Sequence, residues 1–371
     1  MDSYTSFCFI KLCNDSIIVI TKKIMGLHLD NFLNLPCKQP MKVGFLINPY
    51  AGEGIHNQKN VINQIIRYLP KAEFVTSNGI LGLNWMPENK VTEIVEIDYL
   101  NTKEDTVSVI LKILDKTVDL LLIIGGDGTL ADVARAVYIK QSRIPIVGIG
   151  LGSANVGDLI SIRKDLLKKS ELKLYPRKVS ALAAIYEGKL VGLCFNDIVI
   201  GNTIVATING QITQIDIMKK RKGVILEKNP QSIGRKDTYI KIIDRQKKEL
   251  MIKNCSFGTI VASKVDKRYV GKAITGALNE ISCKNIPAAI SVIDKPVIMP
   301  SVTKDEYLQM EPFTTITASI PEESKAIIGN VKTGSFLIID GNPEIELKQT
   351  SIVEIENINF NFNTYKACDC I

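Results

Sequence analysis

Histidine and tryptophan are scarce in this chain. Its 371 residues include two histidines, His28 and His56, and one tryptophan. A metal site built on several histidines, or a serine-histidine-aspartate triad, therefore has too little histidine to form. We expect no protein-built metal site, and any acid-base chemistry falls to carboxylates or lysine.

The cysteines follow no pairing pattern. There are eight, and apart from Cys368 and Cys370 they are scattered singly, with none of the paired spacing of zinc ligands. Scattered thiols are typical of a reducing compartment, so we expect a cytoplasmic protein.

Long apolar runs and strong charge are also missing. Lys11 and Asp15 interrupt the apolar N-terminal stretch, short of the roughly 20 apolar residues that a membrane helix needs, so we expect no membrane partner. The formal net charge of +7, from 46 basic and 39 acidic residues, suits a small anionic ligand. Because no basic run is interleaved with aromatic residues, we expect no nucleic-acid partner. The longest basic cluster, Lys219 to Lys222, is interpreted as a solvated turn rather than a phosphate contact.

What the chain does have is enough apolar sequence for two cores. Hydrophobic residues make up 46% of it, and its length exceeds that of a usual single core. A regular pattern begins only at Met41, so we expect residues 1–40 to be a dispensable N-terminal extension. Residues 41–172 and 173–371 are the two expected domains.

The first domain alternates apolar strands with amphipathic helices. The expected strands are 43–47, 95–97, 119–124 and 144–149, and the expected helices are 57–69, 102–114 (with a capping-box-like start) and 130–138. Continuous apolar strands separated by helices predict a parallel sheet covered on both faces. This is an open, Rossmann-like α/β domain, whose ligands bind beyond the carboxyl ends of the strands.

The second domain shows the alternation of half-buried strands. Short runs of period two lie at 180–186, 190–200, 204–213, 238–243 and 335–353, with hairpin signals at Asn209-Gly210 and Asp340-Gly341-Asn342. These features predict a mainly β, sandwich-like domain, and we expect its last segment to return toward the first domain.

One turn carries the chemistry. Gly125-Gly126-Asp127-Gly128-Thr129 follows an apolar strand and precedes a helix, so its backbone amides favour an anion. Glycine lets the backbone approach a phosphate closely. A carboxylate repels a nearby phosphate, so its presence in this turn indicates a chemical role. Asp127 is suited to be a general base toward an attacking hydroxyl. The alternative is a tight turn in which Asp127 only caps the helix.

Two further loops should lie at the same sheet edge. Asn48-Pro49 follows the first strand of the domain, and a glycine-rich loop, 148–158, follows a later strand. We take Asn48 and Pro49 of the first loop, and Gly152, Ser153 and Asn155 of the second, as nucleotide or phosphate contacts.

The segment 121–129, with Asn48-Pro49-Tyr50-Ala51-Gly52 before it, resembles the superfamily of NAD kinases, diacylglycerol kinases and sphingosine kinases, and most closely the archaeal and bacterial ATP-NAD kinase-like branch. The resemblance is strong from Met41 to Asp158 and weaker to Ile355. It implies an NAD kinase-like fold and a homo-oligomer.

The resemblance also implies an activity. The chain would transfer the γ-phosphoryl group of ATP, with Mg²⁺, to the 2′-hydroxyl of NAD to give NADP. Asp127 would be the base, and Gly125, Gly126, Gly128 and Thr129 would hold phosphates. Asn196 and Asp197 resemble an Asn-Glu signature that holds substrate, with Asp in place of Glu. Asp340-Gly341 resembles a turn near the family's cleft, although a plain hairpin turn is an alternative. A lipid or other small-molecule kinase and a non-catalytic nucleotide sensor remain open.

Overall fold

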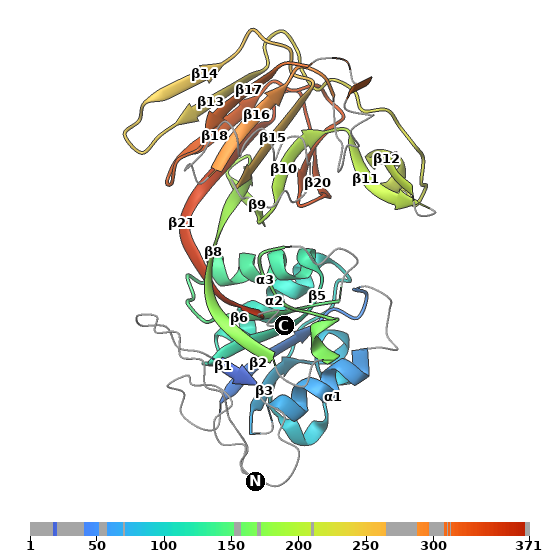
Figure 1. Cartoon of the computed structure of the whole chain (residues 1–371), viewed down its shortest axis with the longest axis vertical. Coiled ribbons are helices and arrows are strands. Elements are labelled where there is room, and N and C mark those ends of the chain that lie inside the picture. Colours follow the sequence, from blue (N-terminus) through green and yellow to red (C-terminus); the bar gives the residue numbers. More distant parts are fainter. Residues whose placement is uncertain are drawn as a thin grey trace, which may run out of the picture.

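The computed structural model describes residues 18–20, 41–51, 58–69, 71–151, 157–168, 172–208, 211–264, 288–296, 308–309, 311 and 313–367. Over these residues the chain forms an α/β domain, in the lower half of Figure 1, and a β domain above it. Two long strands connect them.

The first domain contains a parallel sheet. Its strands, in spatial order, are β7 (Ile160–Arg163), β6 (Ile146–Gly150), β5 (Leu120–Gly125), β2 (Lys42–Ile47), β3 (Glu73–Ser77) and β4 (Val91–Val95). Every neighbouring pair runs parallel. The predicted open parallel sheet is therefore confirmed.

Helices cover both faces of this sheet. They are α1 (Gln58–Tyr68), α2 (Lys103–Leu114) and α3 (Asp127–Ile139), with short 3-10 turns at Gly79–Leu81, Leu83–Trp85, Glu88–Lys90 and Leu166–Lys168. Ile110 of α2 and Val133 of α3 pack in one apolar cluster with Leu121 of β5. Ile62 of α1 packs in another with Leu122, because successive strand residues face opposite sides.

Three local predictions were wrong. The third helix begins at Asp127 rather than at Leu130, because extended Gly126 serves as its N-cap. Residues Glu73–Ser77 form a strand that was missed; its polar residues hide the apolar pattern although Thr76 and Ser77 are buried. The strand expected at 95–97 ends at Val95 instead.

The second domain is a sandwich of two antiparallel sheets. One sheet has the order β17 (Thr315–Ser319), β16 (Ala288–Ile293), β15 (Thr259–Lys264), β10 (Asp197–Gly201), β19 (Ser335–Ile339) and β20 (Asn342–Leu347). The other has β14 (Glu249–Ile252), β13 (Tyr239–Ile243), β18 (Lys325–Gly329), β21 (Ile352–Ala367), β8 (Leu172–Tyr186) and β9 (Lys189–Cys194). Ile260 of the first and Ile355 of the second share one buried cluster. The predicted mainly β, sandwich-like fold is confirmed.

A small lobe extends from this sandwich. The hairpin β11 (Thr203–Ile208) and β12 (Gln211–Asp216) leads into α4 (Ile217–Arg221). The cluster 219–222, expected as a turn, therefore lies mostly in a short exposed helix. Asp216 stabilises that helix by accepting a hydrogen bond from the Lys219 backbone N–H, at 3.0 Å.

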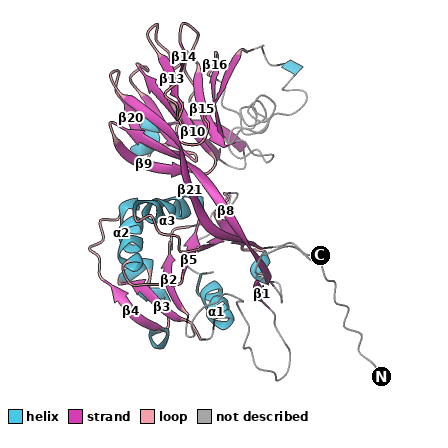
Figure 2. Cartoon of the chain, turned by 90° about the vertical axis from the view of Figure 1, so that its left-hand side faces the viewer, coloured by secondary structure: helices cyan, strands magenta, loops and turns pink. Residues whose placement is uncertain are grey.

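The two domains share strands. β8 and β21 pair antiparallel along most of their lengths and pass from one domain into the other (Figures 1 and 2). In the first domain β21 pairs parallel with β6, where Thr364 lies opposite Ile146. Residues Ile18–Ile20, within the expected extension, form β1 and pair with β8. Among the described helices none is long and apolar enough to cross a membrane.

Candidate functional site

A cleft of about 1110 Å³ lies between the two domains, at the carboxyl ends of the parallel strands. From the first domain it is lined by the loop after β2, the start of α2 and the start of α3, and from the second by β9 and the turn between β19 and β20. Ligands of open α/β sheets bind at this edge. Of the predicted site residues, the described lining includes Asn48, Gly126, Asp127, Gly128 and Thr129.

The glycine turn presents a helix N-terminus to this cleft. β5 ends at Gly125, Gly126 is extended, and α3 begins at Asp127. A Cβ on Gly125 would lie 2.7 Å from Thr129 Cβ, so only glycine lets the strand and helix pack this closely. Unpaired first-turn N–H groups and the helix dipole make this end favourable for phosphate.

The first loop is bonded to the glycine turn. Asn48 Nδ2 donates to Thr129 Oγ1 at 2.9 Å, and the Asn48 backbone N–H donates to the Ile124 carbonyl at 2.8 Å. The Tyr50 N–H donates to Asn48 Oδ1, at 3.0 Å. Asn48 therefore fixes two predicted elements relative to each other, whereas Pro49 is buried and does not line the cleft.

Asp127 is oriented by the segment after β6. Its Oδ1 accepts a hydrogen bond from the Gly157 N–H at 3.1 Å. A Cβ on Gly157 would lie 2.8 Å from that oxygen, so glycine is required there for Asp127 to keep its position. The carboxylate stands in the first turn of α3, where negative charge interacts favourably with the helix dipole. The predicted contacts Gly152, Ser153 and Asn155 lie in 152–156, outside the described residues.

Asp340 reaches the cleft from the second domain. Asp340 and Gly341 have φ of +47° and +79° and form the predicted hairpin turn between β19 and β20. The Asp340 carboxylate accepts hydrogen bonds from the N–H groups of Phe195, Asn196 and Asp197, at 3.0, 2.8 and 3.1 Å. Burial raises the pKa of Asp340 to about 7, and the nearby Asp197 acts in the same direction. The turn is thus both a hairpin and part of the cleft wall.

The pair Asn196 and Asp197 is held behind this wall. Asp197 is 4% exposed, and neither residue belongs to the described cleft lining. Asn196 lies in the turn between β9 and β10, Asp197 is the first residue of β10, and Asp340 binds the N–H groups of both. The structure therefore brings them next to the cleft but not to its surface, and their contact with substrate stays a prediction.

Sequence reasoning missed Asp132, Lys103 and Glu344, which also line the cleft. Asp132 lies one helical turn after Gly128, so helical spacing from the glycine turn could have identified it. Burial raises the pKa of Asp132 to about 7, against the opposing effect of Lys103 and Arg135. Glu344 comes from a distant strand, and no local pattern marks it.

The lining is acidic. Its carboxyl groups come from both domains: Asp105, Asp127, Asp132, Asp340 and Glu344. Lys103 is the one basic residue in the described part of the lining. Within the described ranges, no three His, Cys, Asp or Glu side chains gather closely enough to hold a metal ion.

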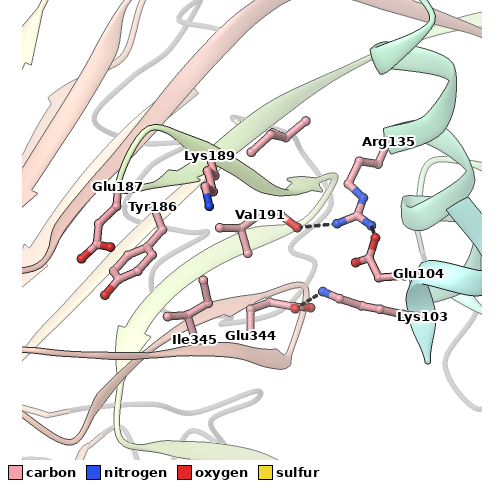
Figure 3. Close-up of a pocket in the computed structure, with 10 residues that line it drawn as sticks. Lys103, Glu104, Arg135, Tyr186, Glu187, Lys189, Val191, Glu344 and Ile345 are labelled. Atoms are coloured by element: carbon pink, nitrogen blue, oxygen red, sulfur yellow. Dashed lines mark hydrogen bonds and ion pairs between the residues drawn. The ribbon is translucent and has the colours of Figure 1, made fainter. Parts of the chain in front are cut away.

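A second, smaller pocket of about 500 Å³ adjoins the cleft and shares Lys103, Val191 and Glu344 with it (Figure 3). Lys103 of α2 forms an ion pair with Glu344 of β20. Arg135 of α3 pairs with Glu104 and donates a hydrogen bond to the Val191 carbonyl of β9, at 3.0 Å. The Lys103–Glu344 pair and the Arg135–Val191 hydrogen bond connect the two domains beside the cleft.

Comparison with known proteins gives one family match. Residues 43–156 match the family described as ATP-NAD kinase N-terminal domain. An uncharacterized protein of Archaeoglobus fulgidus is 28% identical over 307 residues, covering 82% of this chain and 92% of its own. The match includes Asn48 and the glycine turn, so the resemblance inferred from these residues is confirmed for the first domain.

Two solved structures match most of this chain at low sequence identity. Yeast NADH kinase complexed with NADH has a TM-score of 0.44 and 13% identity, over 89% of this chain and 83% of its own. A diacylglycerol kinase from Bacillus anthracis has a TM-score of 0.41 and 13% identity, over 87% of this chain and 96% of its own.

Proposed function

We propose that this chain, whose residues 43–156 match the ATP-NAD kinase N-terminal domain family, transfers the γ-phosphoryl group of ATP to a hydroxyl group, and that the acceptor is the 2′-hydroxyl of NAD. The observation that carries the proposal is the position of Asp127. It stands in an interdomain cleft, in the first turn of a helix whose N-terminus favours phosphate.

A cleft that binds a nucleotide and an acceptor together must be large enough for both. A cleft of about 1110 Å³ slightly exceeds the range of roughly 300–1,000 Å³ that is usual for a single small ligand. Walls from both domains would let the nucleotide lie on the α3 N-terminus while the acceptor contacts the β domain. NAD as the acceptor follows from the family resemblance alone, and contact of NAD with Asn196 and Asp197 stays a prediction because neither residue lines the cleft.

Mg²⁺ fits the acidic lining. A polyphosphate would be repelled by carboxylates unless cations accompany it. Mg²⁺ usually binds through substrate phosphates, water and one or two carboxylates, and so needs no cluster built by the protein alone. Asp127 and Asp132 lie in the first two turns of α3 and line the cleft, and the ion would neutralise charge on the phosphates.

Asp127 and the first N–H groups of α3 account for the steps of the proposed reaction. The acceptor oxygen attacks the γ-phosphorus in line, its O–H proton passes to the Asp127 carboxylate, and the bond to the β-phosphate oxygen breaks to release ADP. The backbone N–H groups at the start of α3 stabilise charge on the transferred group. The hydrogen bonds from Gly157 to Asp127 and from Asn48 to Thr129 keep these parts in position.

The test is incubation with Mg²⁺, ATP and NAD, followed by measurement of NADP. We expect NADP from the unaltered chain and, for Asp127→Asn, a loss of about 10²-fold or more in turnover with ADP binding retained. Asp165→Asn, an exposed carboxylate that does not line the cleft, is the matched control. Undiminished turnover in Asp127→Asn would exclude the base role.

The same assay can detect a different acceptor or a different phosphoryl donor. Phosphorylation of a lipid or another hydroxyl compound, without NADP, would replace the acceptor but keep the reaction. Use of polyphosphate would replace the donor. Tight nucleotide binding without any product would indicate a sensor instead of an enzyme. The homo-oligomer stays a prediction, which light scattering of the purified chain would measure.

A further inference from the structure

The ion pair between Lys103 and Glu344 joins the domains where the cleft meets the smaller pocket (Figure 3). Lys103 is the first residue of α2, and Glu344 lies on β20 close to the hairpin turn that carries Asp340. The lysine side chain is 39% exposed and the glutamate side chain 17%. Both residues line both cavities, so Lys103 borders the cleft as well as the smaller pocket.

Lys103 has no equivalent in the described lining of the cleft. All the other ionisable side chains there, apart from tyrosines, are carboxyls, and Asp132 lies close enough for Lys103 to lower its pKa. A phosphate chain that enters this cleft therefore meets one side-chain cation in the described part of the lining. Lysine is a flexible cation on a four-carbon stem, which suits it to follow a phosphate group.

Arg135, the other cation at the junction, is held in place. Its side chain is 8% exposed, pairs with Glu104 and bonds to the Val191 carbonyl. It lines the smaller pocket but not the cleft. Arg135 thus supports the domain contact, whereas Lys103 is the cation that can change partners.

Lys103 can exchange Glu344 for a phosphate at a small cost in free energy. A partly exposed ion pair favours its closed form by a factor of about five or less. A lysine in the first turn of a helix is also opposed by the helix dipole, so Lys103 gains little from its place in α2. A charge-assisted contact with phosphate is stronger than an exposed ion pair.

We propose that Lys103 is a mobile phosphate ligand, which leaves Glu344 when a nucleotide enters the cleft. Nucleotide binding and the contact between α2 and β20 then compete for one side chain. Occupation of the cleft loosens this connection between the domains, and release of the nucleotide restores it. The inference rests on the proposed function only in requiring that the cleft binds a phosphate chain.

The test is a double-mutant cycle on binding, read by calorimetry with Mg²⁺ and ADP and, separately, with pyrophosphate. Lys103→Gln should weaken binding by about tenfold, because a charged contact to phosphate is lost. Glu344→Gln should strengthen binding by about two- to fivefold, because the competing partner is removed. In the double variant, Glu344→Gln should leave the affinity almost the same as in Lys103→Gln alone, because no lysine remains to be released from Glu344.

The double variant separates the proposal from simpler electrostatics. If the two substitutions changed the affinity in opposite directions but additively, the two residues would act only as fixed charges. That result would overturn the proposed exchange of partners by Lys103. Shifts in the same direction would mean that the pair is purely structural and would also overturn it. Failure of the unaltered chain to bind ADP or pyrophosphate would overturn it as well.

Matched controls come from the smaller pocket. Lys189→Gln and Glu187→Gln change a lysine and a glutamate that line that pocket but not the cleft, and neither should change the affinity. Thermal unfolding of each variant checks that the fold is intact. Binding is measured without turnover, so the two proposals are tested separately. The exchange of partners by Lys103 can be disproved while the chain still forms NADP, and it can be confirmed in a chain that forms no product.

Discussion

At the scale of single residues, the site depends on where carboxyl groups lie. Asp127 is exposed to the cleft and oriented by Gly157, whereas Asp340 uses its oxygens to bind the turn between β9 and β10. Asp132 lies between these roles, since it faces the cleft but is buried enough for its pKa to rise to about 7. The same side-chain type therefore serves as a candidate base, a structural acceptor and a titrating group, according to its surroundings.

Asp132 should make stability depend on pH. Its folded-state pKa of about 7 exceeds the ordinary value of 3.8, so between these values the folded chain retains a proton that the unfolded chain has lost. Stability is therefore expected to be greatest at the acidic end of this window, to fall as pH rises toward 7, and to level off above it. Asp132→Asn should make this fall shallower in urea unfolding measured across pH.

Some of the fall should persist in Asp132→Asn, because the pKa of Asp340 is raised in the same direction. Asp165→Asn is the control and should leave the slope unchanged, since this carboxylate is exposed. An unaltered slope in Asp132→Asn would show that Asp132 ionises normally in the folded chain.

At the scale of elements, the cleft is made by the ends of helices and strands. α3 starts in the glycine turn, and α2 starts at a capping box in which Thr102 and Asp105 each bond to the other's backbone. The Thr102 side chain accepts from the Glu104 N–H at 3.3 Å, and Asp105 accepts from the Thr102 N–H at 3.2 Å. The box fixes the first turn of α2, which places Lys103 beside the cleft.

Loss of this cap should destabilise the chain measurably. Thr102→Ala is expected to lower the free energy of unfolding by about 1 kcal/mol, because helix N–H groups lose their acceptor. Urea unfolding monitored by circular dichroism would measure it. Thr350→Ala, an exposed threonine in a turn, is the control and should change stability by less than about 0.5 kcal/mol. Equal effects in both variants would count against a role for the capping box.

At the scale of the whole molecule, the domains are joined by shared strands as well as by side chains. β8 and β21 belong to the β sandwich at one end, and at the other they extend onto the parallel sheet through β6. The aromatic pair Phe360 and Phe362 of β21 packs in the same cluster as α3. This arrangement differs from two domains on a flexible linker, because backbone hydrogen bonds run continuously between the sheets.

The shared strands should make the domains unfold together. We expect one transition in differential scanning calorimetry, with a calorimetric enthalpy close to the van't Hoff enthalpy. Addition of ADP with Mg²⁺ should raise the midpoint of that single transition, because a ligand that binds the folded chain stabilises it. Two separate transitions, of which only one shifts with ADP, would show that the domains are energetically independent.

The sequence by itself determined the local features of the first domain and of its site. Apolar strand runs, helix periodicity and the glycine turn are short-range patterns, so they predicted the parallel sheet, the start of α2 at Thr102 and the position of Asp127 beyond a strand end. The missed strand β3 and the early start of α3 have local causes too, in polar residues buried by the sheet and in glycine as an N-cap.

Only the tertiary structure decided which distant residues meet. Asp340 lies 143 residues from Asp197, and Lys103 lies 241 residues from Glu344, yet both pairs are in direct contact. No periodicity can reveal such contacts, because they arise when β8 and β21 bring the sandwich over the carboxyl edge of the parallel sheet. The sequence therefore identified the phosphate-favouring turn, whereas the pairing of strands far apart in the chain decided what faces it.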